Sequence, residues 1–455
     1  MTRGVGIKNH DPSAPVALTH WEDGGRAVEE ALDMCDALAG FDPNMKVFIK
    51  PNLVEYVPKE ILNFSPYGIL TTSVVLEGII RYLKDAGAKD ITIAEGALIN
   101  EEFKCGTSVT YKELGYDVFT ERYGVKLLDL ADTEFVKVGL GGFSLHISKT
   151  ILEDVDFFIN APVLKTHEQT IVSLGFKNNK GCLSTKSKQI CHHRKRLIDE
   201  FVARLGMRLY PHLNVIDGIY SLENGPMHMG FAHRENLIVA SRDMYSCDCV
   251  GSTLMGFDPS EIVCLSEFAE EYNRSLNVDD IEVRGLNVAD HIHKIHHLDV
   301  NDSWHSGSEV PDFFAKAGVK GFRMPHPYQT LCTGCSMMFP LAVLLIIQGS
   351  MAKGGEPYDD YELLGGKIVK PSGHANKTFL LGECITAANR KGEGIKEAVK
   401  ISGCPPSFEE MLQAFNENGI KCDKSAVDYF FNNRAKSYAK KGVYRPEHYF
   451  MKEEK

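Results

Sequence analysis

Short apolar runs of strand length alternate with helical repeats over the first two thirds of the chain. Residues 46–50, 91–94, 157–160 and 213–216 are runs of this kind, and each ends in a polar cluster. Residues 74–86 lie between the first two runs and carry apolar side chains at helical spacing. Strands separated by helices predict βαβ units and a mostly parallel sheet. Because such sheets bind ligands beyond the carboxyl ends of their strands, the polar clusters mark the expected ligand crevice.

The pattern weakens between residues 278 and 324, where a histidine-rich stretch is typical of a solvated surface rather than of a metal site. A strand and helix pattern resumes at residue 325 and ends in a basic, aromatic tail. A chain of 455 residues is long enough for two or three cores. We predict an α/β domain over residues 1–277, a linker or insertion over 278–324, and a smaller α/β domain over 325–455.

The composition and the net charge argue against some classes of binding partner. A formal net charge of −11 argues against nucleic acid and anionic membranes. The longest apolar run, residues 337–347, is shorter than the roughly 20 residues that cross a bilayer. The first residues lack the apolar core of an export signal. We therefore expect a cytoplasmic protein without a membrane or nucleic-acid partner; a second copy of the chain stays open as a partner.

Four of the twelve cysteines have the arrangement of a cluster site. Cys332 and Cys335 form a C-x-x-C pair, Cys384 follows an expected strand, and Cys404 precedes an expected helix. In a chain without an export signal, cysteines are more typical of metal binding than of disulfides. Four thiolates from such positions suit a [4Fe–4S] cluster or zinc. We favour the cluster, because zinc sites usually have two short cysteine pairs and this chain has one.

The residues that flank these cysteines resemble the proximal-cluster region of nickel–iron hydrogenase small subunits and of the related complex I subunit. The motifs Cys-Thr-Gly-Cys-Ser, Gly-Glu-Cys and Gly-Cys-Pro-Pro follow one another here in the order that those proteins have. The resemblance implies that Cys332, Cys335, Cys384 and Cys404 hold one [4Fe–4S] cluster, so that residues 325–455 form an iron–sulfur domain. Nothing in the chain resembles the further clusters of those subunits, so hydrogenase activity does not follow.

A second group of candidate residues is basic and lies in the N-terminal region. Lys165 and His167 follow an expected strand, and a Gly- and Asn-rich segment after them carries Lys177 and Lys180. Basic groups beside such turns suit a carboxylate or phosphate, and histidine can move a proton near neutral pH. A basic surface loop is the alternative. We predict a site for an anionic small molecule.

We assign roles to these and to nearby polar residues at the expected strand ends. The candidate catalytic residues are His167, Lys177 and His193. The candidate substrate-binding residues are Lys50, Asn52, Lys165, Lys180, Asp217 and Glu223. Cys182 and Cys191 lie in the same region and leave a second metal or cofactor in the N-terminal domain open.

Many motifs of the N-terminal region resemble the "domain of unknown function 362" family of anaerobic bacteria and archaea. They include Val-Phe-Ile-Lys-Pro-Asn at residues 47–52, Asn-Ala-Pro-Val-Leu-Lys-Thr-His at 160–167, Lys-Asn-Asn-Lys-Gly at 177–181 and Glu-Asn-Gly-Pro at 223–226. The resemblance implies a domain rather than a reaction. Members of that family are often fused to, or encoded with, iron–sulfur modules, which agrees with the expected cluster.

A weaker similarity is to nickel-pincer lactate racemases. In that family a histidine and a lysine stand ten residues apart, as His167 and Lys177 do here. The similarity implies a cofactor tethered to the lysine and histidines that handle protons or the metal. The glycine-rich context of that lysine is not well reproduced in this chain.

Three functions follow from these patterns. The first is an iron–sulfur oxidoreductase that passes electrons to or from the bound anion. It would use an external ferredoxin-like partner, because the chain has no Gly-x-Gly-x-x-Gly dinucleotide fingerprint. The second is a redox-neutral racemase or isomerase of a hydroxy acid, and the third is a non-catalytic electron-transfer subunit of a larger complex.

Overall fold

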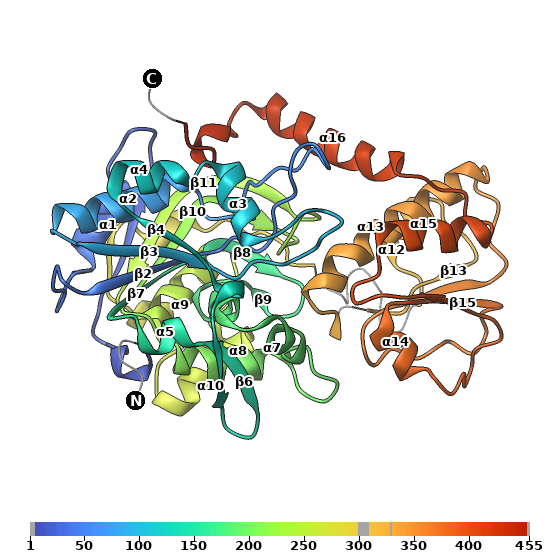
Figure 1. The fold of residues 1–455 in the computed structure, drawn as a ribbon, viewed down its shortest axis with the longest axis horizontal. Helices are drawn as coiled ribbons and strands as arrows, with labels where there is room; N and C mark the ends of the chain where they lie inside the picture. The colour runs from blue at the N-terminus through green and yellow to red at the C-terminus, as the bar shows by residue number, and fades with distance from the viewer. Residues whose placement is uncertain (1–4, 299–308, 328–329, 453–455) are drawn as a thin grey trace.

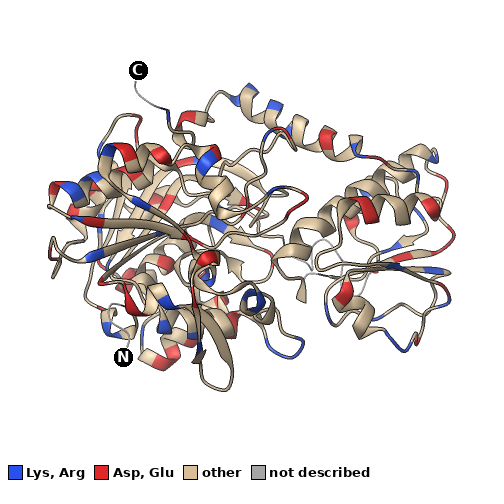
Figure 2. Cartoon of the chain, viewed as in Figure 1, with Lys and Arg blue, Asp and Glu red and all other residues tan. Residues whose placement is uncertain are grey.

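The computed structural model describes residues 5–298, 309–327 and 330–452, and in it the chain forms two α/β lobes (Figure 1). The large lobe is built on a ten-stranded sheet, and the small lobe on a four-stranded parallel sheet. Most strand pairs of the large sheet are parallel as well. The predicted α/β class with mostly parallel sheets is confirmed. Acidic and basic residues are interspersed over the outer helices (Figure 2).

The large sheet has the strand order β12-β1-β11-β10-β7-β2-β3-β4, and β8 branches from β10 to pair with β9. The chain reverses direction at β11, which is antiparallel to both β10 and β1. The bounds are β1 (Val16–His20), β2 (Lys46–Pro51), β3 (Asp90–Glu95), β4 (Lys126–Asp129), β7 (Phe157–Ala161), β8 (Val163–His167), β9 (Ile171–Val172), β10 (Leu213–Glu223), β11 (Phe231–Ser241) and β12 (Val283–Gly285).

Helices cover both faces of the large sheet, and the alternation of side chains along each strand decides which face they meet. In β2, Val47 and Ile49 pack in the core that includes α1 (Ala27–Met34) and α2 (Ser73–Asp85). Phe48 points to the opposite core. That core is covered by α8 (Ile198–Arg208), α9 (Met244–Leu254) and α10 (Val263–Tyr272). A hairpin of β5 (Phe135–Gly139) and β6 (Ser144–Ser148) lies beside the sheet.

The small lobe has the strand order β13-β14-β15-β16. Its strands are β13 (Phe322–Arg323), β14 (Tyr361–Leu364), β15 (Lys377–Leu381) and β16 (Ala398–Ile401), and its helices are α12 (Asp312–Lys316), α13 (Thr333–Ala352), α14 (Glu383–Ala388) and α15 (Phe408–Glu417). The structure differs from the expected linker at both ends. β12 extends the first sheet, and α12 and β13 belong to the small lobe. Residues 299–308, in the middle of that stretch, and 328–329 lie outside the described residues.

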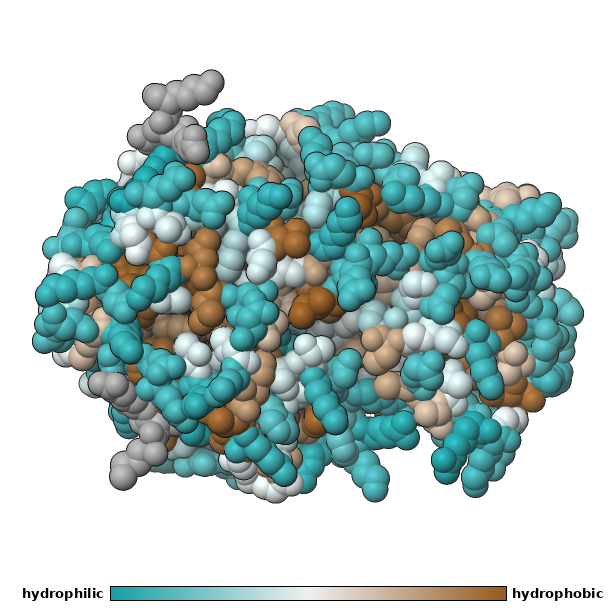
Figure 3. Space-filling model, viewed as in Figure 1, coloured by the Kyte–Doolittle hydropathy of each residue, from teal (hydrophilic) through white to brown (hydrophobic). Residues whose placement is uncertain are grey.

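One helix among the described residues, α13, is long and apolar enough to cross a membrane by length and composition. Most of its apolar window is buried inside the protein, and it packs against α15 and α16. A buried core helix of a soluble lobe has the same composition. On the face in Figure 3, hydrophilic side chains predominate over both lobes. The cytoplasmic location stays a prediction.

The C-terminal segment returns to the large lobe instead of staying with the small one. Helix α16 (Ser425–Lys441) runs between the lobes (Figure 1). The sequence predicts that the basic tail belongs to the cluster domain. In the structure, however, its residues Tyr438, His448 and Tyr449 are buried against the large lobe. Tyr438 Oη accepts a hydrogen bond of 2.9 Å from the Ala232 N–H, and Tyr449 Oη accepts one of 3.1 Å from the Gly68 N–H. The aromatic residues of the tail therefore tie the two lobes together.

Candidate functional site

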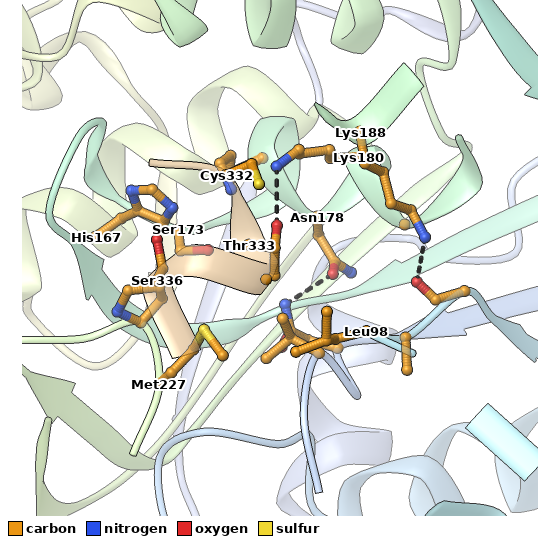
Figure 4. Close-up of a pocket in the computed structure, with 18 of the residues that line it drawn as sticks. Leu98, His167, Ser173, Asn178, Lys180, Lys188, Met227, Cys332, Thr333 and Ser336 are labelled. Carbon is orange, nitrogen blue, oxygen red and sulfur yellow. Dashed lines mark hydrogen bonds between the residues drawn. The ribbon is translucent and has the colours of Figure 1, made fainter. Parts of the chain in front are cut away.

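A cavity of about 150 Å³ lies where the two lobes meet. Figure 4 shows Cys332, Thr333 and Ser336 of the small lobe together with His167 and Lys180 of the large lobe. The polar lining from the large lobe comprises Lys50, Asn52, Glu95, Lys165, His167, Glu168, Ser173, Lys177, Asn178, Lys180, Thr185, Lys188, Gln189 and His192. Members of both groups singled out in the sequence, several basic residues together with Cys332 and Cys404, thus border one cavity.

The strands place the basic residues as the pattern of a parallel sheet predicts. Lys50 and Glu95 lie at the carboxyl ends of β2 and β3, and β8 carries Lys165 and His167. The segment after β9 turns into α6 (Gly175–Asn178) and a short 3-10 helix, Asn179–Cys182, which bring further lysines to the same edge. The cavity therefore occupies the ligand position usual in open α/β sheets.

Two of the predicted substrate-binding lysines, Lys50 and Lys165, already donate all their hydrogen bonds to acceptors of the protein. The ammonium of Lys50 donates to Glu95 Oε2 at 2.9 Å, to Asn178 Oδ1 at 3.2 Å and to the Pro51 carbonyl at 3.0 Å. Lys165 donates to Asn52 Oδ1 at 2.9 Å and to two backbone carbonyls. Burial lowers the pKa of Lys165 to about 7. An ammonium has three protons to donate, so these two lysines build the wall of the cavity.

His167 is oriented by the backbone that follows it. Its Nδ1 accepts hydrogen bonds from the N–H groups of Gln169 at 3.0 Å and Thr170 at 3.4 Å. The neutral ring therefore carries its proton on Nε2, which has no hydrogen-bond partner among the described residues. Burial, followed by the charges of Lys177 and Lys180, lowers the pKa of His167 well below its usual value. His167 thus offers the cavity an N–H donor.

Glu168 and Lys177 also present polar atoms that make no hydrogen bond within the described residues. Glu168 Oε1 accepts from Ser336 Oγ at 3.3 Å, while Glu168 Oε2 is buried and has no hydrogen bond in the described part of the chain. Burial raises the pKa of Glu168. Burial, followed by the charge of Lys180, lowers the pKa of Lys177 to about 7. Burial thus favours the neutral form of both side chains.

A chain of hydrogen bonds runs from Lys180 to the small lobe. Lys180 Nζ lies 2.6 Å from His192 Nε2 and 3.3 Å from Thr333 Oγ1. An ammonium donates to Nε2, so the neutral His192 ring carries its proton on Nδ1, which lies 2.8 Å from Gln169 Oε1. The Gln169 amide donates in turn to the Leu331 carbonyl at 3.0 Å. This series of hydrogen bonds ends at Leu331, the residue before Cys332.

Three predicted site residues lie away from the cavity. His193 is exposed, and its ring accepts from the Lys195 N–H. Asp217 is buried and accepts from the backbone N–H groups of Thr72, at the start of α2, and Ile219. Glu223 pairs with His233 at 3.1 Å. Burial raises the pKa of Asp217 to about 6, which fits a structural carboxyl group.

Four further residues that were given no role from the sequence also line the cavity: Glu168, Lys188, Gln189 and His192. Lys188 and His192 lie within the basic segment that the sequence indicated, whereas nothing in the sequence pointed to Glu168 or Gln189. Glu168 directly follows the predicted His167, and His192 directly precedes the predicted His193. Adjacent residues usually point to different sides, and no sequence signal tells which one faces a cavity. Lys188 donates to the Gly96 carbonyl at 2.5 Å, and burial lowers its pKa to about 8.

The four predicted cluster cysteines are neighbours. Cys332 precedes the first residue of α13, Cys335 lies in its first turn, Cys384 lies in the first turn of α14, and Cys404 follows β16. The Cys332 thiol shares a hydrogen bond with Cys335, which lowers the pKa of Cys332, and the charges of Lys367 and Lys180 act in the same direction. The pKa of Cys335 is raised by Cys332 and burial first, and also by the charges of Cys384 and Cys404.

No group of three or more His, Cys, Asp or Glu side chains within residues 5–298, 309–327 and 330–452 is placed to hold a single metal ion. The cluster and the zinc alternative both stay predictions. Cys182 and Cys191 are both buried, and different lysines surround them: Lys50 and Lys188 for the first, Lys180 and Lys177 for the second. A second metal or cofactor in the N-terminal domain stays a prediction.

The backbone of Gly181 lies tightly against the side chains of Glu95 and Lys50 in the cavity wall. A Cβ at this position would collide with Glu95 Oε1 and would lie 2.6 Å from Lys50 Nζ. We expect Gly181→Ala to lower the free energy of unfolding by about 1–3 kcal/mol through overpacking. Gly139→Ala is the matched control, because a Cβ there meets nothing within 4 Å. Urea unfolding followed by circular dichroism checks this, and equal midpoints for the two variants would contradict it.

The fold and the cavity define an α/β domain with a polar cavity at the edge of its sheet, joined to a smaller cysteine-bearing lobe. Residues 47–253 match the family described as "Domain of unknown function (DUF362)". A thylakoid-associated protein of Synechocystis sp. (strain ATCC 27184 / PCC 6803 / Kazusa), sll1697, is 26% identical over 225 residues, which is 48% of this chain and 66% of that relative. The family match confirms the resemblance for the large lobe. The hydrogenase-like cluster domain lies outside residues 47–253 and stays a prediction.

Proposed function

We propose that the protein is an iron–sulfur oxidoreductase that acts on a small anionic molecule in the cavity between the lobes. The observation that carries this proposal is that Cys332 and Cys404 line the same cavity as Lys177 and Lys180. A group held by those cysteines would border the ligand directly, without a second carrier between them. The basic lining would compensate the negative charge of the ligand.

The four cysteines lie near enough for their charges to act on one another, which supports their proposed role as the ligands of one [4Fe–4S] cluster. Cys332, Cys335 and Cys384 lie at helix starts, where backbone N–H groups stabilise thiolates. The cluster, when bound, would supply single-electron transfer. Cys404 is exposed, so a ferredoxin-like partner can approach from that side.

The residues of the large lobe have distinct tasks in this proposal. Lys177 and Lys180 bind the anion, and the Nε2–H of His167 donates a hydrogen bond to it. Glu168, whose pKa is raised by burial, holds a proton beside the ligand. The bond between Ser336 and Glu168 and the bonds from Lys367 to the Gln189 and His192 carbonyls hold the lobes around the ligand and exclude water.

Anaerobic purification followed by electron paramagnetic resonance tests the proposal. We expect a brown protein with bound iron and sulfide that dithionite reduces to a paramagnetic state. Small carboxylates or phosphate should change the spectrum, because the ligand borders the cysteines. A colourless, iron-poor preparation would contradict the proposal. A reducible cluster whose spectrum no anion changes would contradict the proposed binding of an anionic substrate beside the cluster.

Gln189 makes a separate prediction about the cluster potential. Its side-chain N–H donates to Cys404 Sγ at 3.7 Å across the lobe boundary. Donors to the sulfurs stabilise the more negative, reduced state and raise the potential. We expect Gln189→Ala to shift the midpoint potential to a more negative value in a redox titration. Gln413→Ala, which loses its bond to Glu417 on α15, is the control and should leave the potential unchanged.

A second candidate is the redox-neutral isomerase or racemase of a hydroxy acid. The observation in its favour is that His167 and Lys177 border one cavity and both have atoms free to exchange a proton. It predicts exchange of a carbon-bound hydrogen of a hydroxy acid with deuterium from the solvent, without electron transfer. The lined cavity disfavours the third function, a non-catalytic electron-transfer subunit. Alanine at His167 that abolishes a defined activity but keeps the iron content would exclude that role.

A further inference from the structure

Three polar groups that line the cavity have no hydrogen-bond partner among the described residues, although Glu168 Oε2 lies 3.8 Å from His167 Nδ1. Within the described residues Lys177 makes no hydrogen bond and no ion pair, although it lines the cavity. Glu168 Oε2 is buried without a hydrogen bond, and the Glu168 side chain is 5% exposed. The third atom is His167 Nε2. Buried polar groups normally have partners, so this unpaired set indicates a polar ligand that supplies them.

Lys177 differs from the other lysines of the cavity. Lys50 and Lys165 have three acceptors each, Lys180 is held by His192 and Thr333, and Lys188 by the Gly96 carbonyl. Lys177 has no hydrogen-bond acceptor among the described residues. The charge of Lys180 lowers its pKa, and the opposite charge of Glu168 acts against that in part. A desolvated lysine beside another cation is the arrangement in which the amine becomes a nucleophile.

We infer that Lys177 forms an imine with the carbonyl carbon of a small 2-oxo acid bound in the cavity. The amine nitrogen bonds to the carbonyl carbon, the carbon–oxygen bond breaks, and the oxygen leaves as water. The proton for the leaving hydroxyl comes from the Glu168 carboxyl group, and the carboxylate of the substrate lies beside Lys180 and the Nε2–H of His167. No oxidant or reductant is needed for this step.

The inference deepens the proposed function and rests on its anion cavity, but not on the cluster. A protonated imine accepts an electron more readily than the free carbonyl, so the two proposals fit one site. The volume of about 150 Å³ and the apolar side chains of Leu98 and Met227 favour a short carbon chain.

Reductive trapping tests the inference on the anaerobically purified full chain. Glyoxylate, pyruvate or 2-oxobutyrate is added with sodium cyanoborohydride, and the adduct is located by peptide mass spectrometry. We expect adduct on Lys177 about tenfold faster than on Lys137, an exposed lysine of β5. Lys177→Arg keeps the positive charge but cannot form an imine, so it should lose the cavity adduct. Lys137→Arg is the matched surface control and should retain it.

The outcomes separate this inference from the proposed function. Equal labelling of Lys177 and Lys137 with all three acids would contradict specific imine formation at Lys177. An oxo acid that raises the thermal midpoint of both the wild type and Lys177→Arg, without an adduct, would show non-covalent binding and overturn the inference while the proposed function stands. A specific adduct on a protein that lacks iron would support the inference and count against the proposed redox role.

Discussion

Replacing Cys404 by alanine is expected to abolish the iron–sulfur cluster while both lobes stay folded. Cys404 is exposed, and its sulfur accepts one hydrogen bond, from Gln189. The side chain therefore contributes little packing, and its loss should cost no more than about 0.5 kcal/mol in the free protein. As a proposed cluster ligand, however, it has no replacement nearby. We expect iron and sulfide to fall from a full cluster to a small residue, with loss of the paramagnetic signal after reduction.

The control for this variant is Cys422→Ser in the same lobe. Cys422 is buried, and Asn416 holds its backbone N–H and C=O groups, which serine keeps. Its thiol takes no part in the proposed site, so iron content should equal that of the wild type. Circular dichroism of all three proteins shows whether the fold is retained. Full iron content in Cys404→Ala would remove this cysteine from the proposed ligand set.

The parallel sheet and its ligand edge were predictable because both follow from local pattern. Apolar runs of strand length, each closed by a polar cluster, fix where a strand ends, and the topology of parallel sheets brings those ends together. Lys50 at the end of β2 and Glu95 at the end of β3 therefore meet although they are 45 residues apart. The family match over residues 47–253 agrees with the motifs seen in that part of the sequence.

The partners of each side chain were not predictable, because long-range contacts decide them. Lys50 and Lys177 look alike as lysines near a turn, yet Lys50 has three acceptors and Lys177 has none in the described structure. Asp217 looks like a carboxylate at a strand end, but it accepts the Thr72 N–H at the start of α2. The contact between the lobes, which puts Cys332 beside Lys180, depends on both sheets and on α16 together.

The buried pair of Lys50 and Glu95 should have the largest effect on stability. Their side chains are 0% and 3% exposed, and the two charges lie 2.9 Å apart. Removing one partner leaves the other charge buried without compensation, which costs about 3–5 kcal/mol. We expect Lys50→Met to lower the free energy of unfolding by that amount, measured by urea denaturation of the anaerobic protein. Glu95 keeps bonds from the Leu53 and Gly96 N–H groups, which favours the lower end of the range.

Two further variants show whether the charge pair is responsible. Lys46→Met changes an exposed lysine of the same strand and should shift stability by less than about 0.5 kcal/mol. In the double variant Lys50→Met/Glu95→Gln no charge remains unpaired, so part of the loss should be recovered, because replacing both members of a buried pair is often nearly neutral. If Lys50→Met costs no more than Lys46→Met, the wall of the cavity does not depend on this pair, and Lys50 becomes available again as a ligand-binding residue.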